Sequence, residues 1–213
     1  MESCSVRNRV MPRPYSDWAN RRGGKRQGSP TTGVPVKIAV IVGSTRPKRL
    51  GSAVGAWVLE QAEQHGGAEF TLLEVADFDL GTNYEQSTDK SYEEPSTQRW
   101  SDVVDEFDGY VFVTPEYNHG LPAPMKSAVD LLYTEWAGKA VAFVGYGGVG
   151  AARAVEQWRM VVANLGLLGV RQALHLQMAD DFEDDRVAPL PKRTGEMKSV
   201  LDQLVELTAT LRG

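Results

Sequence analysis

Short apolar runs alternate with helical periodicities along most of the chain. Residues 36–42 form a nearly continuous apolar run, which is typical of a strand buried on both faces. Val54, Trp57, Val58 and Ala62 then recur at the spacing of one helix face. The same alternation predicts strands at residues 70–75, 110–114, 140–144 and 170–177, and helices at about 96–107, 125–132, 155–165 and 197–211.

Five strands that alternate with helices predict one doubly wound α/β domain. Its five-stranded parallel sheet would be covered by helices on both faces and joined by right-handed crossovers. Residues 170–177 are the least apolar strand and are expected at an edge. Residues 77–95 are polar and too long for a simple connection, so they are predicted to be a functional or interface loop. Trp136 and Trp158 are expected in the core.

Residues 1–35 differ from the rest of the chain in pattern and charge. They lack helical and strand periodicity and carry seven Arg and Lys against two acidic residues, whereas the remainder has 16 basic and 26 acidic residues. Such a segment buries too little apolar area to offset the entropy of ordering it, which predicts a disordered arm before a domain at 36–213. One interpretation of this segment is a solvated tail, or a translation start placed too early, with Met11 as the alternative start. This interpretation is favoured over a contact with nucleic acid or another anionic surface, because charge alone carries no specificity.

Several classes of protein are disfavoured by what the sequence lacks. The single Cys4 excludes an intrachain disulfide, and no apolar run approaches the roughly 18 residues that span a bilayer. No apolar core of a secretory signal is present. Acidic residues 180–185 lack the glycine and terminal glutamate of a calcium loop, so a solvated loop and no metal site are predicted.

In doubly wound sheets, ligands bind beyond the carboxyl ends of the strands, where the strand order reverses. The loop after the first strand, residues 43–52, combines glycines, hydroxyls and the cations Arg46, Lys48 and Arg49 in an otherwise acidic domain. With the N–H groups of the following helix, this pattern predicts a phosphate site, although a plain turn with solvated cations is the alternative. Ser52 follows the second glycine where a Walker loop has Lys, so a Walker loop is excluded.

The loop after the third strand, residues 114–124, is rigid and rich in flat or polar side chains. Three prolines fix its backbone, and Tyr, Asn and His could hold a planar ring. A general-base role for His119 is possible, but a structural hydrogen bond is favoured. Glu116 is expected to be a turn residue rather than a base.

The loop after the fourth strand, residues 145–150, matches the pattern G-x-G-x-x-G. A dinucleotide fingerprint belongs to the first strand of its unit and needs an acidic residue about 20 positions later. Residues 165–177 contain no Asp or Glu. Close backbone packing against a flat ligand is therefore favoured over a dinucleotide site.

Taken together, the three loops resemble the NADPH-dependent FMN reductase family of flavodoxin-like proteins. The resemblance spans residues 36–211 and is carried by GSTR at 43–46, TPEYNH at 114–119 with Pro122, KSAVD at 126–130 and YGG at 146–148. It implies the strand order 2-1-3-4-5, with FMN across strands one and three. Relatives often have a Pro-rich loop after strand two, where this chain has DFDLGTNY at 77–84, so the electron acceptor does not follow from the resemblance.

The resemblance also implies a set of cofactor-binding residues. The FMN phosphate would be held by Ser44, Thr45, Arg46, Leu50 and Gly51. The isoalloxazine would be bordered on one side by Pro115, Glu116, Tyr117, Asn118 and His119, and on the other by Tyr146, Gly147 and Gly148. No catalytic side chain is implied, because N5 of the flavin carries the chemistry.

The implied activity is an FMN-dependent oxidoreductase that passes hydride from NADPH or NADH to a small-molecule acceptor. Quinones, azo compounds, metal oxyanions and free flavin are the expected acceptors. A cytoplasmic homodimer or homotetramer without membrane contact is expected. A flavodoxin-type electron carrier, a flavin-loaded binding or sensor module, and a nicotinamide-only dehydrogenase stay open as alternatives.

Overall fold

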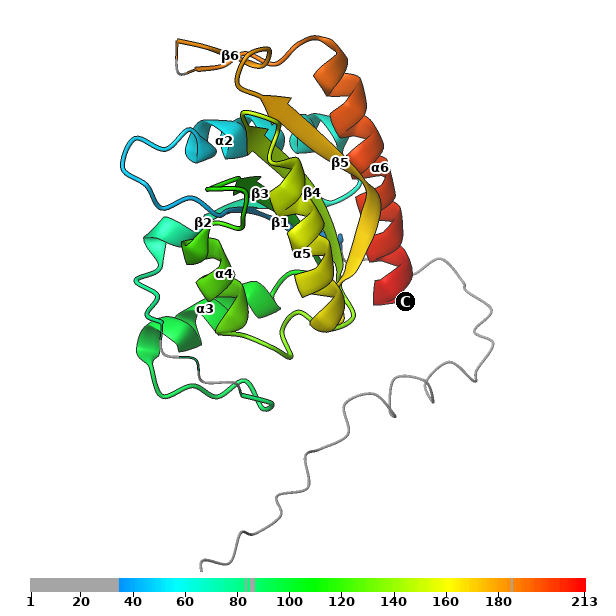
Figure 1. The fold of residues 1–213 in the computed structure, drawn as a ribbon. Helices are drawn as coiled ribbons and strands as arrows, with labels where there is room; N and C mark the ends of the chain where they lie inside the picture. Colours follow the sequence, from blue (N-terminus) through cyan, green and yellow to red (C-terminus); the bar gives the residue numbers. More distant parts are fainter. Residues whose placement is uncertain (1–34, 83, 85–86, 185) are drawn as a thin grey trace, which may run out of the picture. The chain divides into compact units, whose positions relative to one another are not determined.

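The computed structural model describes residues 35–82, 84, 87–184 and 186–213, so the predicted arm lies, apart from Pro35, outside the described residues. The described chain forms a five-stranded sheet in which all neighbouring strands are parallel (Figure 1). Its strands are β1 (Lys37–Val42), β2 (Glu69–Glu74), β3 (Gly109–Pro115), β4 (Ala140–Gly147) and β5 (Leu168–Gln177). They lie in the order β2-β1-β3-β4-β5, which confirms the predicted flavodoxin-like order.

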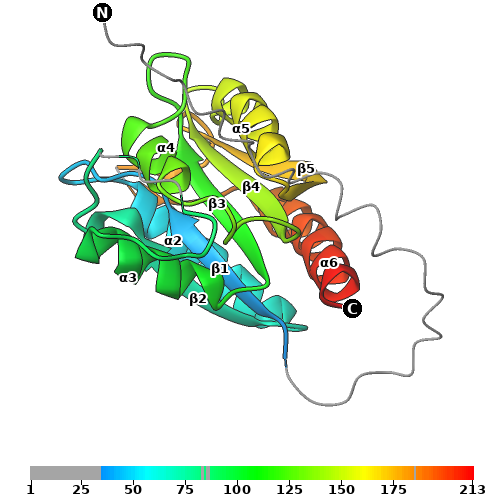
Figure 2. The ribbon, with the colours of Figure 1, turned by 90° about the horizontal axis from the view of Figure 1, so that it is seen from below.

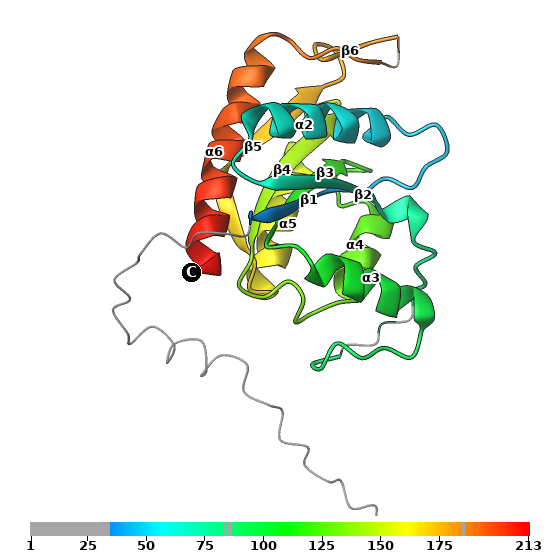
Figure 3. The same ribbon diagram turned by 180° about the vertical axis from the view of Figure 1, so that it is seen from behind.

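Helices cover both faces of the sheet (Figures 2 and 3). One face carries α2 (Gly51–His65) and α6 (Lys192–Arg212), and the other carries α3 (Pro95–Asp105), α4 (Ala123–Asp130) and α5 (Ala152–Asn164). Since every strand of the sheet runs in the same direction, the loops after β1, β3 and β4 leave the sheet at one edge. Within the described residues, no helix is long and apolar enough to cross a membrane.

The core lies in two layers, one on each face of the sheet. Successive residues of β1 point to opposite faces, so Ile41 joins the α3-α4-α5 layer and Val40 the α2-α6 layer. Trp136 and Trp158 are fully buried, which confirms their predicted place in the core. Trp158 meets the ring of Phe112 edge-on at 5.4 Å between centroids, a geometry that adds to the stabilisation from burial alone.

The carboxyl end of β4 is longer than the sequence pattern predicts. Residues 145–147, expected in a loop, pair in register with residues 175–177 of β5. A Cβ atom on Gly145 would lie 2.3 Å from the carbonyl oxygen of Gly150, so this glycine lets the chain fold back on the strand. The predicted edge position of the last strand is confirmed, because β5 ends the sheet.

The acidic segment after β5 departs in part from the solvated loop that the sequence predicts, because Asp180, Glu183 and Asp184 are exposed but Asp181 is buried. Two short antiparallel strands, β6 (Phe182–Glu183) and β7 (Arg186–Val187), form there. Asp181 is fully buried and forms an ion pair with Arg193 at the start of α6, with 2.9 Å between Oδ2 and Nη2. The prediction was wrong here because the guanidinium that compensates the carboxylate lies 12 residues further along the chain.

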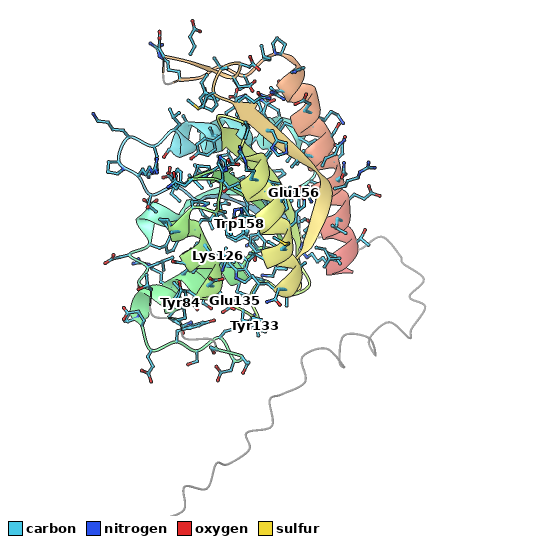
Figure 4. All side chains as sticks on the ribbon, viewed as in Figure 1. Tyr84, Lys126, Tyr133, Glu135, Glu156 and Trp158 are labelled. Carbon is cyan, nitrogen blue, oxygen red and sulfur yellow. The ribbon has the colours of Figure 1, made fainter. Side chains whose placement is uncertain are left out.

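The predicted functional loop at 77–95 begins at the end of the 3-10 helix η1 (Val75–Asp77), and its described residues form no further helix or strand before α3. Residues 83, 85 and 86 lie outside the described part of the chain. Tyr92 is buried and donates a hydrogen bond of 2.8 Å to Glu135, a buried residue of the segment after α4 (Figure 4). Burial raises the pKa of Tyr92 well above its usual range, and the Glu135 carboxylate adds to this effect. These contacts anchor the end of the segment; its functional role stays a prediction.

Candidate active site

The loops after β1 and β3 touch at the carboxyl edge of the sheet. Ser44 of the first loop and Tyr117 of the second are 73 residues apart in sequence, yet their hydroxyl oxygens lie 2.7 Å apart. Ser44 is buried, whereas Tyr117 is half-buried. The parallel strands therefore bring together two of the three segments that the sequence singled out.

The first loop presents a row of main-chain donors. Within the described part of the chain, no group accepts a hydrogen bond from the N–H groups of residues 44–46 or 51–53. Residues 51–53 are the first turn of α2, where the N–H groups have no partner inside the helix and the helix dipole is positive. Free N–H groups beside a helix N-terminus suit an anion such as a phosphate group.

The three cations of this loop have different surroundings. The guanidinium carbon of Arg46 lies 3.6 Å from the centroid of the Tyr117 ring. Arg49 instead forms an ion pair with Glu74, and its Nε donates to that carboxylate at 3.0 Å. Lys48 is exposed and has a left-handed backbone with φ of 57°. Of the three cations that were predicted to bind the phosphate, Arg49 is already neutralised by Glu74. Arg46 and Lys48 remain as candidates.

Glu74 is a residue of this site that the sequence reasoning missed. It ends β2 and also accepts a hydrogen bond of 3.1 Å from Ser52 in the first turn of α2. Its carboxylate therefore holds the end of the loop and the start of the helix together. The signal was available, since β2 is the neighbour of β1 and its last residue must emerge at the same edge.

The second loop is a tight turn locked onto α5. Tyr117 and Gly120 exchange two main-chain hydrogen bonds of 3.1 and 2.9 Å, and the central residues Asn118 and His119 both have positive φ. Gln157 of α5 donates to the carbonyl oxygen of His119 at 2.9 Å. This hydrogen bond involves only the main chain of His119, so it is not the structural hydrogen bond that was predicted for the side chain. In the described residues, the exposed imidazole itself has no hydrogen-bond partner.

Glu116 connects the same loop to the start of α5. Its carboxylate accepts a hydrogen bond of 3.1 Å from the main-chain N–H of Arg153 and forms an ion pair with the Arg153 guanidinium. A carboxylate at a helix N-terminus is stabilised by the exposed N–H groups and the dipole. These contacts are those of a structural turn residue, in line with the sequence-based expectation, rather than of a free base.

The third loop uses its glycines in two different ways. Gly150 has φ of 64°, and a Cβ atom there would lie 2.6 Å from Cβ of His175, so this glycine is required by packing within the chain. By contrast, a Cβ atom on Gly148 would meet no atom within 4 Å. Gly147 directly precedes Gly148 and has φ of 151°, and a Cβ atom there would meet only the main-chain nitrogen of Ala151, at 3.9 Å. Only Gly147 and Gly148 are therefore free to face a ligand.

The remaining residues predicted to bind the cofactor also lie at the carboxyl end of the sheet. Tyr146 is buried and lies beneath the first loop, because a Cβ atom on Gly51 would be 2.7 Å from its hydroxyl oxygen. Burial raises the pKa of this phenol well above its usual range, and Ser44 and the nearby guanidinium groups offset only part of the rise. Thr45 and Leu50 are half-buried, and Pro115 is buried at the end of β3.

This donor set fits a phosphorylated flavin. The free N–H groups, the Ser44 hydroxyl and Arg46 suit the phosphate, and the open backbone at Gly147 and Gly148 leaves room for a flat ring. No cluster of three or more potential metal ligands occurs among the described residues.

Comparisons with known proteins agree with this arrangement. The family model of the NADPH-dependent FMN reductases matches residues 36–181. An NAD(P)H-dependent FMN reductase of Schizosaccharomyces pombe is 32% identical over 182 residues, which cover 80% of this chain and 90% of that protein. A quinone reductase of Pseudomonas putida is 29% identical over 157 residues, 69% of this chain and 81% of that protein.

The fold is also found among solved structures. The flavoenzyme NAD(P)H:(acceptor) oxidoreductase FerB of Paracoccus denitrificans superimposes with a TM-score of 0.65 at 23% identity, covering 83% of this chain and 98% of that one. At this level of identity, the likeness supports the fold alone. The match of the family model over residues 36–181, at the loops described above, shows that the chain belongs to the NADPH-dependent FMN reductase family.

Proposed function

We propose that this FMN-dependent NAD(P)H oxidoreductase passes its electrons to a quinone. The observation that carries the proposal is the composition of the surface beside Gly148. Val149 and Met178 are large apolar side chains that are 48% and 37% exposed. The main-chain N–H of Met178 donates to the carbonyl oxygen of Gly147 at 3.0 Å, and Val149 follows Gly148 directly, so both residues lie next to the open glycines.

An apolar rim favours a flat, uncharged acceptor over a metal oxyanion, because an anion would lose its hydration there without gaining a partner. The quinone reductase of P. putida is a relative over most of its length. That relationship supports the same acceptor class for this chain.

The residues that would hold FMN are those predicted from the resemblance. Ser44, Arg46 and the main-chain N–H groups of residues 44–46 and 51–53 would bind the phosphate, and Thr45, Leu50 and Gly51 would shape the loop around it. The main chain of the turn at residues 115–119 and that of residues 146–148 would border the ring. Bound FMN supplies hydride acceptance from NAD(P)H and electron release to the second substrate. The protein positions both substrates and contributes no nucleophile.

Turnover with different acceptors tests the acceptor class. The full-length protein loaded with FMN should oxidise NADPH faster with 1,4-benzoquinone than with an azo dye or chromate at equal concentration, followed as loss of NADPH absorbance. Faster turnover with the dye or with chromate would contradict the quinone assignment and leave the family assignment intact.

We also propose that the chain acts as a homo-oligomer in the cytoplasm, with α4 and α5 at the interface. Met160 of α5 is 70% exposed and borders a groove of about 300 Å³. One side of the groove is formed by α4 and the segment after it, and is lined by Asp130 and by Lys126 and Tyr133, which Figure 4 labels. An exposed methionine beside an ion pair gives a surface that a second copy can match by two-fold symmetry.

Met160→Glu should therefore shift the protein to a smaller species, because a buried carboxylate without a partner opposes association. Light scattering coupled to size exclusion measures the mass directly. Ala209→Glu, an exposed position near the end of α6, is the matched control and should leave the mass unchanged. A wild-type monomer, or a Met160→Glu protein of unchanged mass, would contradict the proposed interface.

A further inference from the structure

The side chain of Tyr117 lies at the phosphate end of the candidate site. Its hydroxyl meets Ser44 at 2.7 Å, and its ring lies under the Arg46 guanidinium at 3.6 Å. Both partners belong to the loop whose N–H groups are free for an anion. The family resemblance, in contrast, assigns Tyr117 only as a border of the isoalloxazine ring.

We propose that Tyr117 is a positioning residue that holds Arg46 and Ser44 in place for the FMN phosphate and so makes the site select FMN over riboflavin. This inference rests on the FMN site described above and is independent of the acceptor. Arg46 is exposed and would otherwise sample many rotamers, which would have to be restricted when a phosphate binds. Stacking on an aromatic face restricts the guanidinium before the ligand arrives and leaves its N–H groups at the edge available.

Tyr117 can perform this role because its own position is fixed from the opposite side. Its turn is closed by the two hydrogen bonds with Gly120, and α5 holds the turn through Gln157 and through Arg153 on Glu116. The position of Arg46 is thereby coupled to a helix that follows β4. No contact in the phosphate loop itself provides this support, since Arg49 and Ser52 are directed to Glu74.

Comparing the binding of FMN and riboflavin distinguishes a role of Tyr117 at the phosphate from a role at the isoalloxazine ring. Riboflavin has the same ring as FMN and lacks the phosphate, so a residue that acts on the phosphate through Arg46 affects FMN alone. The experiment titrates full-length flavin-free protein with each flavin and follows the quenching of flavin fluorescence. The variants are Tyr117→Leu, Tyr117→Phe, Arg46→Ala and the double variant Tyr117→Leu/Arg46→Ala.

Tyr117→Leu should raise the Kd for FMN roughly tenfold, whereas the Kd for riboflavin should change by less than about twofold. Tyr117→Phe keeps the ring under Arg46 and loses only the hydroxyl, so it should recover part of the loss. In the Arg46→Ala background, Tyr117→Leu should have less than about a twofold further effect on FMN, because its partner has been removed.

Lys48→Ala is the matched control, since Lys48 is a cation of the same loop without a stacking partner among the described residues. Its effect on FMN should add to that of Tyr117→Leu. Equal losses of FMN and riboflavin affinity would place Tyr117 at the ring and overturn the proposal. Additive effects of Tyr117→Leu and Arg46→Ala, or an unchanged FMN affinity in Tyr117→Leu, would overturn it as well. If Tyr117→Leu does not fold, the same comparisons with Tyr117→Met, which also removes the ring under Arg46, decide the question. Quinone turnover at saturating FMN reports separately on the proposed function.

Discussion

Replacing Arg193 with methionine should lower the free energy of unfolding by about 3–5 kcal/mol, because it leaves the Asp181 carboxylate as a buried charge without its cation. Asp181 is fully buried and accepts three hydrogen bonds from the Arg193 guanidinium, at 2.9 to 3.2 Å. The same carboxylate accepts main-chain N–H groups of Gln177 and Leu190. One side chain therefore joins β5, the segment after β7 and α6.

Urea unfolding followed by circular dichroism measures this loss. Lys198→Met is the matched control, because Lys198 forms an ion pair with Asp202 on the same helix and both partners are at least half exposed. The control should change the free energy of unfolding by about 1 kcal/mol or less. Equal losses of unfolding free energy in Arg193→Met and Lys198→Met would contradict the conclusion that the buried ion pair of Asp181 and Arg193 stabilises the fold.

The same pair gives the stability a defined dependence on pH. Burial alone would raise the pKa of Asp181, but the hydrogen bonds from Arg193, Gln177 and Leu190 outweigh it and lower the pKa. Because the folded-state pKa lies below the unfolded value of about 3.9, the contribution is complete above pH ~5 and is lost as the pH falls through the folded pKa. In Arg193→Met, the free energy of unfolding should therefore fall less between neutral and acidic pH than in the wild type. Urea unfolding midpoints measured over that pH range test this difference.

Arg46→Ala should weaken FMN binding by roughly 10- to 150-fold, equivalent to about 1.5–3 kcal/mol for a charge-assisted contact with the phosphate. Riboflavin affinity should stay close to that of the wild type. Fluorescence titration of the flavin-free protein measures both. Unchanged FMN affinity in this variant would mean that the phosphate binds elsewhere.

The sequence was sufficient to predict most of the fold. Strands such as residues 37–42 are buried on both faces and therefore appear as continuous apolar runs, so the number and order of occurrence of the strands in the parallel sheet were correct. The end of β4 was missed because Gly145 and Gly147 resemble a loop in composition and become strand residues only by pairing with β5. Glycine patterns of this kind are ambiguous until the neighbouring strand is known.

Less of the site could be predicted, since its details depend on pairs of side chains from different loops. The sequence indicated the three loops correctly as neighbours at one edge. It could indicate that Glu74 emerges at this end of the sheet, but not that Glu74 neutralises Arg49. Nor could it indicate that Tyr117 lies against Arg46 and Ser44, because such contacts depend on the relative rotation of segments far apart in the chain. The buried pair of Asp181 and Arg193 was missed for the same reason.

The visible spectrum of the purified full-length protein, before and after anaerobic addition of NADPH, tests the central claim most directly. We expect flavin absorbance that is retained after the protein is supplied with FMN and desalted, and that is bleached by NADPH and restored by a quinone. A protein that holds FMN without being bleached by NADPH or NADH would be an electron carrier. A protein that stays colourless after FMN is added would contradict the flavin site itself.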